Sequence, residues 1–307
     1  MKNKLESFKW TLPLCMATAC SLALAQQEPP LTVSGSLATG VEYNSNVSVA
    51  ELESASGQSD IAATVDAGLD MSWQATGQLT VSGGYSFSSQ SYQDFDNFDL
   101  DMHMLYADIS QDFERFSVGA NHYYADAKLG GDDFLILNQS SVYVGRLINE
   151  QWFVRGALNI SDKSFSGFAA RDADTSGLSL DAFWFFNQGR SSLVLGYAYD
   201  DEDTRSQAFA YEADTLRIRY SNSFMLLGLE SDLQLGLRTQ QRDYKGITPS
   251  IGVPRDDNHY IADTSLKMNV QPWLAVTGKL ERGNYQSRLP SADYSEERVS
   301  LNVEISF

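Results

Sequence analysis

The sequence predicts an all-β protein: a closed antiparallel transmembrane β-barrel of about fourteen strands, with short periplasmic turns and longer acidic extracellular loops. Three observations predict it. The N-terminus has the features of a secretory signal, long segments alternate apolar and polar residues, and the chain ends on the aromatic residue Phe307. After Gln26 no apolar run approaches the length of a membrane helix, so strands would have to cross the membrane.

The N-terminal segment predicts export. The first nine residues contain three lysines, Lys2, Lys4 and Lys9. The apolar stretch 10–24 follows, and the small-residue motif Ala23-Leu24-Ala25 lies at its end. This stretch is shorter than the roughly twenty residues of a spanning helix, and the motif suits signal peptidase. We expect a signal peptide at 1–25, a short periplasmic leader at 26–30 and an outer-membrane β-barrel at 31–307.

The C-terminal segment shows the alternation most clearly. Every second residue from Val299 to Phe307 is apolar, and the residues between them are Ser300, Asn302, Glu304 and Ser306. One face of this strand would meet lipid and the other a wet lumen. A final strand that stops on an aromatic residue resembles the signal by which outer-membrane barrels are recognised for assembly. We therefore interpret Phe307 as an assembly signal, read by the barrel-assembly machinery.

The same period of two recurs along the chain and gives fourteen expected strands. They are placed at 31–44, 60–74, 78–92, 99–112, 114–127, 138–149, 151–163, 176–187, 191–203, 212–224, 229–244, 258–270, 273–287 and 294–307. Short turns alternate with longer polar loops, as periplasmic turns and extracellular loops do in outer-membrane barrels. An even number of strands puts both ends of the barrel chain on the periplasmic side.

Aromatic residues gather near the expected strand ends, where barrels carry interfacial girdles. The expected girdle comprises Tyr43, Trp73, Tyr92, Tyr123, Tyr124, Trp152, Trp184, Phe186, Tyr199, Tyr244, Trp273 and Tyr285. The partners implied by this surface are outer-membrane lipid and lipopolysaccharide.

Composition excludes several functions. Both cysteines, Cys15 and Cys20, lie inside the expected signal peptide, so the exported chain would have no thiol for redox chemistry, a disulfide or a metal. The formal net charge is −18, which makes the protein a poor partner for nucleic acid. We expect no cofactor.

Acidic clusters are expected in the outer loops. They are Asp94, Asp96, Asp99 and Asp101; Asp132 and Asp133; Asp172 and Asp174; Asp200, Asp201, Glu202 and Asp203; and Asp256 and Asp257. Alternating carboxylates can bind Ca²⁺, but the ligand order of an EF-hand loop is missing. The preferred interpretation is a solvated acidic rim without a metal site.

Basic residues occupy lumen-facing phases on three neighbouring strands. Arg217, Arg219, Arg238 and Lys267 would form a basic ladder on the inner wall. Such a ladder can guide an anionic solute through a narrow lumen. Alternatively, these bases neutralise lumen carboxylates and hold the wall together.

The sequence offers little for catalysis. Its three histidines, at 103, 122 and 259, are isolated from an obvious serine or acid partner, and no G-x-S-x-G motif occurs. We therefore predict no catalytic residues and no enzyme activity. A barrel-embedded hydrolase remains a secondary alternative, in which a cross-strand serine would join His122.

The start of the barrel carries a family resemblance. The segment Gly40-Val41-Glu42-Tyr43-Asn44-Ser45-Asn46-Val47 resembles the G-x-x-Y-x-S-N-V first strand of surface lipoprotein assembly modifier (Slam-type) barrels. The segments 195–204 and 211–220 are similar to the middle hairpins of those proteins. The resemblance spans 31–307 and implies a fourteen-stranded barrel that translocates a lipoprotein. The sequence lacks the N-terminal helical repeat domain that those proteins use.

Two classes of function follow. The first is a pore, either for translocation of a lipoprotein, as the resemblance implies, or for diffusion of a small solute. The second is a plugged structural or adhesive surface barrel without transport, in which inward side chains such as Phe183 and Phe185 close the lumen.

Overall fold

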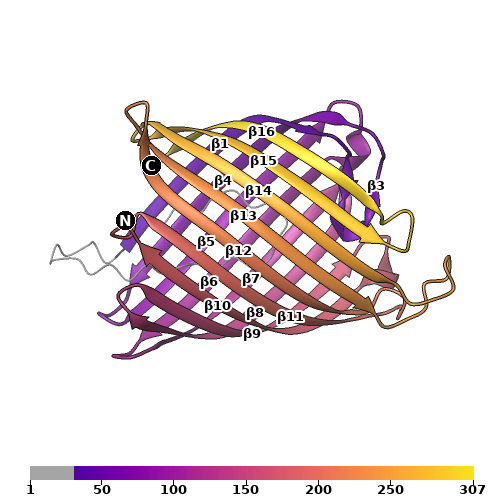
Figure 1. The fold of residues 1–307 in the computed structure, drawn as a ribbon, viewed down its shortest axis with the longest axis horizontal. Helices are drawn as coiled ribbons and strands as arrows, with labels where there is room; N and C mark the ends of the chain where they lie inside the picture. Colours follow the sequence, from indigo (N-terminus) through magenta and orange to yellow (C-terminus); the bar gives the residue numbers. More distant parts are fainter. Residues whose placement is uncertain (1–30) are drawn as a thin grey trace.

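A computed structural model describes residues 31–307, so the expected signal peptide and leader lie outside the described residues. The described chain forms one closed barrel of fourteen antiparallel strands, joined in the order of the sequence (Figure 1). Their bounds are β1 Leu31–Asn44, β4 Asp60–Gln74, β5 Leu79–Tyr92, β6 Leu100–Asp112, β7 Ser117–Leu129, β8 Asp132–Asn149, β9 Trp152–Phe165, β10 Ala173–Phe186, β11 Ser191–Thr204, β12 Tyr211–Leu226, β13 Leu229–Tyr244, β14 Asp256–Gln271, β15 Leu274–Ser287 and β16 Tyr294–Ser306.

The barrel closes because the first and last strands pair. β1 and β16 run antiparallel, with Leu37 opposite Ile305 and Val41 opposite Leu301. Closure satisfies the backbone N–H and C=O groups of both strands, each of which would cost several kcal/mol if left unpaired in lipid. The predicted fold class and strand number are confirmed.

The two faces of the wall follow the period of two. Leu69 and Leu301 point outward and are 50% and 56% exposed, whereas Ser300, one residue away, is 6% exposed. The outward face is therefore apolar along the strands, as contact with lipid requires.

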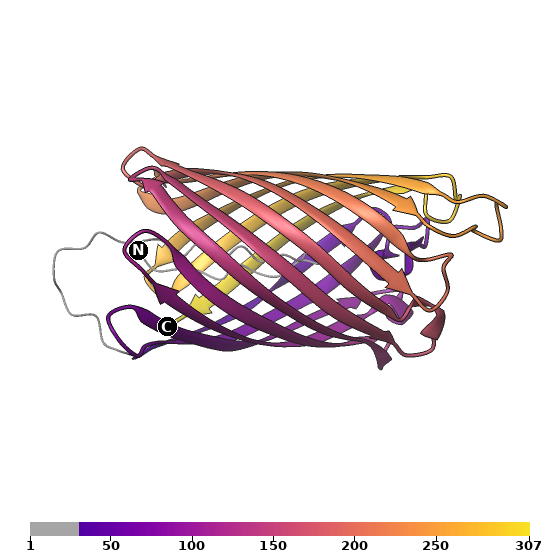
Figure 2. The same cartoon turned by 90° about the horizontal axis from the view of Figure 1, so that it is seen from below.

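The two ends of the barrel differ (Figure 2). The start of β1, the end of β16 and the short turns lie at one end, which the usual asymmetry of such barrels makes periplasmic. The other, extracellular end carries the longer connections and, within residues 31–307, one two-residue turn between residues 129 and 132. Within residues 31–307 no helix is long and apolar enough to span a membrane.

The prediction of a long loop between residues 127 and 138 is wrong. β7 continues to Leu129 and β8 begins at Asp132, joined by a two-residue turn at Gly130 and Gly131 with φ of 59° and 86°. Two successive left-handed residues fit the twist of a tight hairpin, and glycine adopts that conformation without a steric cost.

The expected aromatic girdle is correct only in part. Tyr43, Trp73 and Trp273 point outward and are about half exposed, but four other members face the lumen and are less than 10% exposed. These four are Tyr92, Tyr123, Tyr244 and Tyr285. They occupy the inward phase of their strands, and this position in the pleat outweighs the general preference of tyrosine for the membrane interface.

The connection between β1 and β4 folds into the mouth of the barrel (Figure 2). It contains the short strands β2 (Ser48–Val49) and β3 (Ser54–Ala55), which pair with each other, and the single 3₁₀ turn η1 (Ala50–Leu52) between them. We call residues 45–59 the lumen loop. The sequence predicts only a polar loop for this segment.

Candidate functional site: the lumen loop and its arginine cluster

The residues that carried the family resemblance form the base of the lumen loop. The inward side chain of Asn44, at the end of β1, accepts a hydrogen bond from the backbone N–H of Asn46 at 2.9 Å. The side chain of Asn46 in turn accepts one from the N–H of Gly57 at 2.8 Å. Val47 is fully buried against Ala62 and Tyr92. The motif therefore fixes the point at which the chain leaves the wall and turns inward.

Glu53, at the tip of the loop, meets three guanidinium groups. Its Oε2 accepts hydrogen bonds from Arg255 and, at 3.3 Å, from Arg171. Its Oε1 accepts from the Tyr244 hydroxyl and lies 3.4 Å from Arg242 Nη1. We call Arg171, Arg242 and Arg255 the arginine cluster. One carboxylate is thus held by four donors from three separate parts of the chain.

The environment of Glu53 keeps it ionised. Burial raises the pKa of this carboxyl, but the charges of Arg255, Arg171 and Arg242 together outweigh burial and lower the pKa to about 2. Glu53 also adopts the left-handed conformation, with φ of 52°, which is uncommon for a residue with a side chain. The ion pairs therefore stabilise a backbone conformation that costs about 1–3 kcal/mol.

Two further contacts fasten the turn beside Glu53. Arg171 donates to the backbone carbonyl oxygens of Glu51 and Leu52 at 3.3 and 3.1 Å. The 3₁₀ turn is closed by the Glu53 N–H, which donates to the Ala50 carbonyl, so the Glu51 and Leu52 carbonyls lack partners within the turn and the guanidinium group caps them. Lys163 on β9 lies 3.9 Å from the Glu51 carboxylate and 2.9 Å from that of Glu202.

The other side of the loop is apolar. Val49 and Leu52 pack against a buried cluster on the inner wall of β6 to β9. The cluster comprises Met102, Met104, Tyr106, Tyr123, Ala125, Ala127, Phe134, Leu135, Leu137 and Phe165. A barrel lumen is usually polar, so an apolar inner wall facing an apolar loop indicates a built contact.

These contacts carry the loop across the mouth. It starts and ends on β1 and β4, yet it touches Arg171, which lies in η3 (Ala169–Arg171) between β9 and β10. β10 is seven strands from β1 in either direction around the barrel. The lumen loop therefore reaches the opposite wall.

The predicted basic ladder lies on the inner wall, with its members in different surroundings. Arg217 on β12 is directly opposite Arg238 on β13 and forms an ion pair with Asp181 at 3.2 Å. Lys267 on β14 is 3% exposed and forms an ion pair with Glu304. Arg219 lies two residues beyond Arg217 in the same phase and is exposed.

Three acidic clusters lie in strands and not in loops as expected: Asp132 and Asp133 begin β8, residues 200–203 lie in β11, and Asp256 and Asp257 begin β14. Asp200 to Asp203 lie within β11, and Glu202 points into the lumen, where it is 7% exposed. Glu202 contacts Lys163, which also contacts Glu51 of the lumen loop, so Glu202 lies close to the loop. Glu202 is buried because it has the inward phase of β11, whereas the neighbouring Asp203 is exposed. The expected strand 191–203 already contained these residues, and their acidic composition, which suggested a loop, does not end the strand.

Two histidines point outward. His122 lies 2.9 Å from the Ser140 hydroxyl on the next strand, and His103 lies 2.7 Å from the Tyr85 hydroxyl. Over residues 31–307, no carboxylate contacts His122 to complete a triad, and the pair faces lipid rather than the lumen. The same described range contains no group of three or more side chains arranged to hold a metal.

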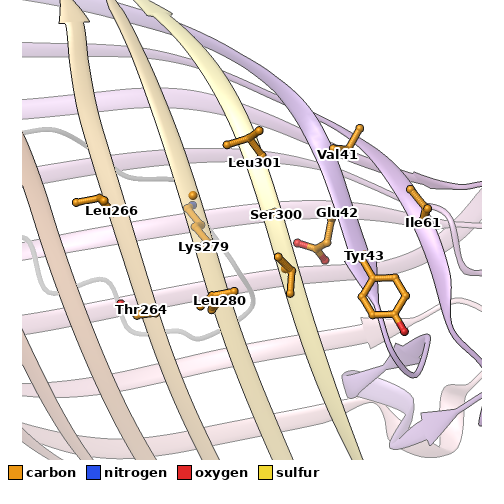
Figure 3. A pocket seen from close by; sticks show the side chains of 12 residues that line it. Val41, Glu42, Tyr43, Ile61, Thr264, Leu266, Lys279, Leu280, Ser300 and Leu301 are labelled. Atoms are coloured by element: carbon orange, nitrogen blue, oxygen red, sulfur yellow. The ribbon is translucent and has the colours of Figure 1, made fainter. Parts of the chain in front are cut away.

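A hollow of about 520 Å³ lies where the barrel closes, over β14, β15, β16 and β1 (Figure 3). Outward aliphatic side chains such as Val41, Leu280 and Leu301 line it, and Gly278 contributes no side chain. Glu42, Lys279 and Ser300 also belong to its lining.

The fold has many solved counterparts. OmpT of Vibrio cholerae, in a loop-deleted form, matches with a TM-score of 0.53 and 10% identity over 91% of this chain and all of that one. An anion-selective porin from Comamonas acidovorans matches with a TM-score of 0.50 and 13% identity, over 90% and 99% of the two chains. At this identity the likeness concerns the fold alone. No curated protein sequence matches.

Fold and comparisons together define an outer-membrane β-barrel involved in transport. The family model described as surface lipoprotein assembly modifier matches residues 35–307. The chain belongs to that family, as the resemblance of its first strand predicted.

Glu53 and the arginine cluster are not among the site residues that the sequence predicts. Arg242 has the same inward phase as Arg238 on β13, so the alternation could have identified it. Arg171 and Arg255 lie in connections between strands, where no period exists. Glu53 is separated from Arg255 by 202 residues, and no local pattern reports such a contact.

Proposed function

We propose that this chain is a conduit that brings a lipoprotein across the outer membrane to the cell surface, and that the lumen loop closes its outer mouth at rest. The family description supports the lipoprotein substrate. The loop supports the closure, because it crosses the mouth and is held by side-chain contacts rather than by the strand ladder of the barrel.

The inward loop is the observation that carries this proposal. A loop that must leave before a large substrate passes should be fastened by contacts that can open without unfolding the wall. Glu53 satisfies this requirement, since all four of its side-chain partners lie outside the loop. The barrel keeps every interstrand hydrogen bond when the loop moves.

A deletion strain tests the substrate. Whole cells lacking the gene would be treated with protease, and the peptides released from lipoproteins would be quantified by mass spectrometry. We expect at least one lipoprotein to lose its surface exposure and to regain it on complementation. Unchanged exposure of every lipoprotein would contradict the proposal.

A reversible lock tests the role of the loop. Ser48 donates to Glu296 on β16 at 2.6 Å, so Ser48→Cys and Glu296→Cys can be joined by a short bis-thiosulfonate linker. The linked protein should fail to restore surface exposure, and reduction should restore it. Each single cysteine variant, treated with the same reagent, is the control.

Passive diffusion of small solutes is the second candidate. It is favoured by the charged inner wall, on which Arg217 and Lys267 are paired with carboxylates. Liposome swelling with neutral sugars separates the two, because a diffusion pore passes them continuously. A plugged structural or adhesive barrel would show neither swelling nor an effect on lipoprotein exposure.

A further inference from the structure

We propose that the arginine cluster, together with the Tyr244 hydroxyl, is a binding site for an anionic oxygen group, a carboxylate or a phosphate, on the transported chain. Glu53 then acts as an internal occupant that the substrate displaces. This inference rests on the proposed conduit function, and it names the chemistry that the conduit recognises at its outer mouth.

The geometry of the donors suits an oxyanion. Each oxygen of Glu53 accepts from one guanidinium group at 3.3 or 3.4 Å and from one further donor. Guanidinium groups match carboxylate and phosphate oxygens in shape as well as in charge. Four donors converging on one carboxylate from η3, β13 and the connection before β14 form a site rather than a single pair.

The site has more positive charge than its occupant neutralises. Three guanidinium groups face Glu53, and two further carboxylates lie near them: Asp257, 3.5 Å from Arg255 Nε, and Glu202, whose charge acts on Arg242. Arg255 is 2% exposed, and its Nη1 atom has no hydrogen-bond partner within residues 31–307. A buried donor without a partner is costly. A phosphate, which has more acceptor oxygens than Glu53, could satisfy it.

The three residues of the arginine cluster also have contacts that do not involve Glu53. The guanidinium carbon of Arg255 lies 4.0 Å from the centre of the Tyr244 ring, that of Arg242 lies 4.7 Å from Tyr211, and that of Arg171 lies 4.2 Å from Phe209. Each arginine is therefore oriented by an aromatic ring. The three groups would stay in place when the loop leaves, ready for another anion.

Current block in planar bilayers tests this site. The probes are inorganic phosphate and hexaglutamate, added to the extracellular side of the Glu53→Gln variant. We expect half-block at a concentration at least tenfold lower than for the unaltered protein, whose site is occupied. Adding Arg255→Gln to Glu53→Gln should remove the gain. Glu51→Gln, which alters a carboxylate two residues away, is the matched control.

Binding by the folded variant provides a second readout if it conducts poorly. Phosphate titration of detergent-solubilised Glu53→Gln, followed by ³¹P NMR line width, should show saturation that Arg255→Gln abolishes. Block by both probes supports a general oxyanion site, and block by one alone assigns the group. Equal block of the variant and the unaltered protein, together with unsaturable phosphate titration, would overturn the inference. Loss of surface exposure in the deletion strain is measured separately, so failure of the conduit proposal would be distinguishable.

Discussion

Glu53 is a single carboxylate among three guanidinium groups, and this imbalance determines how it responds to pH. Its pKa is about 2, below the ordinary value of 4.5, so the closed loop prefers the ionised form. The contribution of Glu53 to loop closure is complete above pH 4.5 and is lost as the pH falls toward 2.

We therefore expect closure to be independent of pH between 5 and 8. The measurement is amide hydrogen exchange of residues 45–59 in the folded barrel, corrected for the intrinsic pH dependence of exchange. A midpoint of loop opening near pH 6 would mean that another group controls the loop.

Replacing Glu53 with glutamine should release the loop. The change removes the carboxylate that Arg171, Arg242 and the fully buried Arg255 share, and breaking a buried ion pair in this way costs about 3–5 kcal/mol. Exchange protection of residues 45–59 should fall accordingly, while protection of the strands stays unchanged. Glu51→Gln should cost less, because its contact with Lys163 is 3.9 Å long and Lys163 keeps its 2.9 Å contact with Glu202.

The assignment of faces makes a prediction at neighbouring residues. Leu301 faces lipid and Ser300 faces the lumen. Arginine at position 301 should destabilise the barrel by about 2–4 kcal/mol if this part of β16 lies near the midplane, and arginine at position 300 should cost less. Equilibrium unfolding in lipid vesicles gives both values, and equal losses would contradict the assignment.

Among the elements, β16 ends at Ser306, one residue before the predicted assembly signal Phe307. Phe307 is 82% exposed, its N–H donates to the Gly35 carbonyl at 3.0 Å, and its ring covers Gly35, where a Cβ atom would clash with it. Because most of the residue remains exposed, its ring buries little surface. Deleting Phe307 should lower the amount of heat-modifiable protein in the outer membrane while leaving the unfolding free energy of the purified barrel nearly unchanged. Equal membrane levels would count against an assembly role.

The strands could be predicted because their signal is local. Alternation along β1, β4 and β13 gave their bounds as the structure has them, and the pairing of β1 with β16 follows from the need to close the sheet in lipid. The lumen loop could not be predicted in this way. Its path depends on the contact of Glu53 with distant residues and on an apolar inner wall whose inward position only the strand phase of β6 to β9 reveals.

The molecule as a whole combines a wall of continuous strands with one segment held across its mouth. The wall is fixed by fourteen ladders of backbone hydrogen bonds, whereas the lumen loop is attached to the far wall only by side-chain contacts and by the capping of its turn. Opening the mouth therefore costs the contacts of one loop and leaves the barrel intact. This separation is what a conduit in a membrane needs.

Single-channel conductance in planar bilayers tests the closure of the mouth most directly. Asn44 and Asp60 are paired at the ends of β1 and β4, so residues 45–59 can be replaced with a two-residue Asn-Gly turn that suits a hairpin. We predict that this variant folds, shifts on heating like the unaltered protein, and forms a stable open channel several-fold more conductive than it. Equal conductance of the two proteins would contradict a mouth closed by the lumen loop.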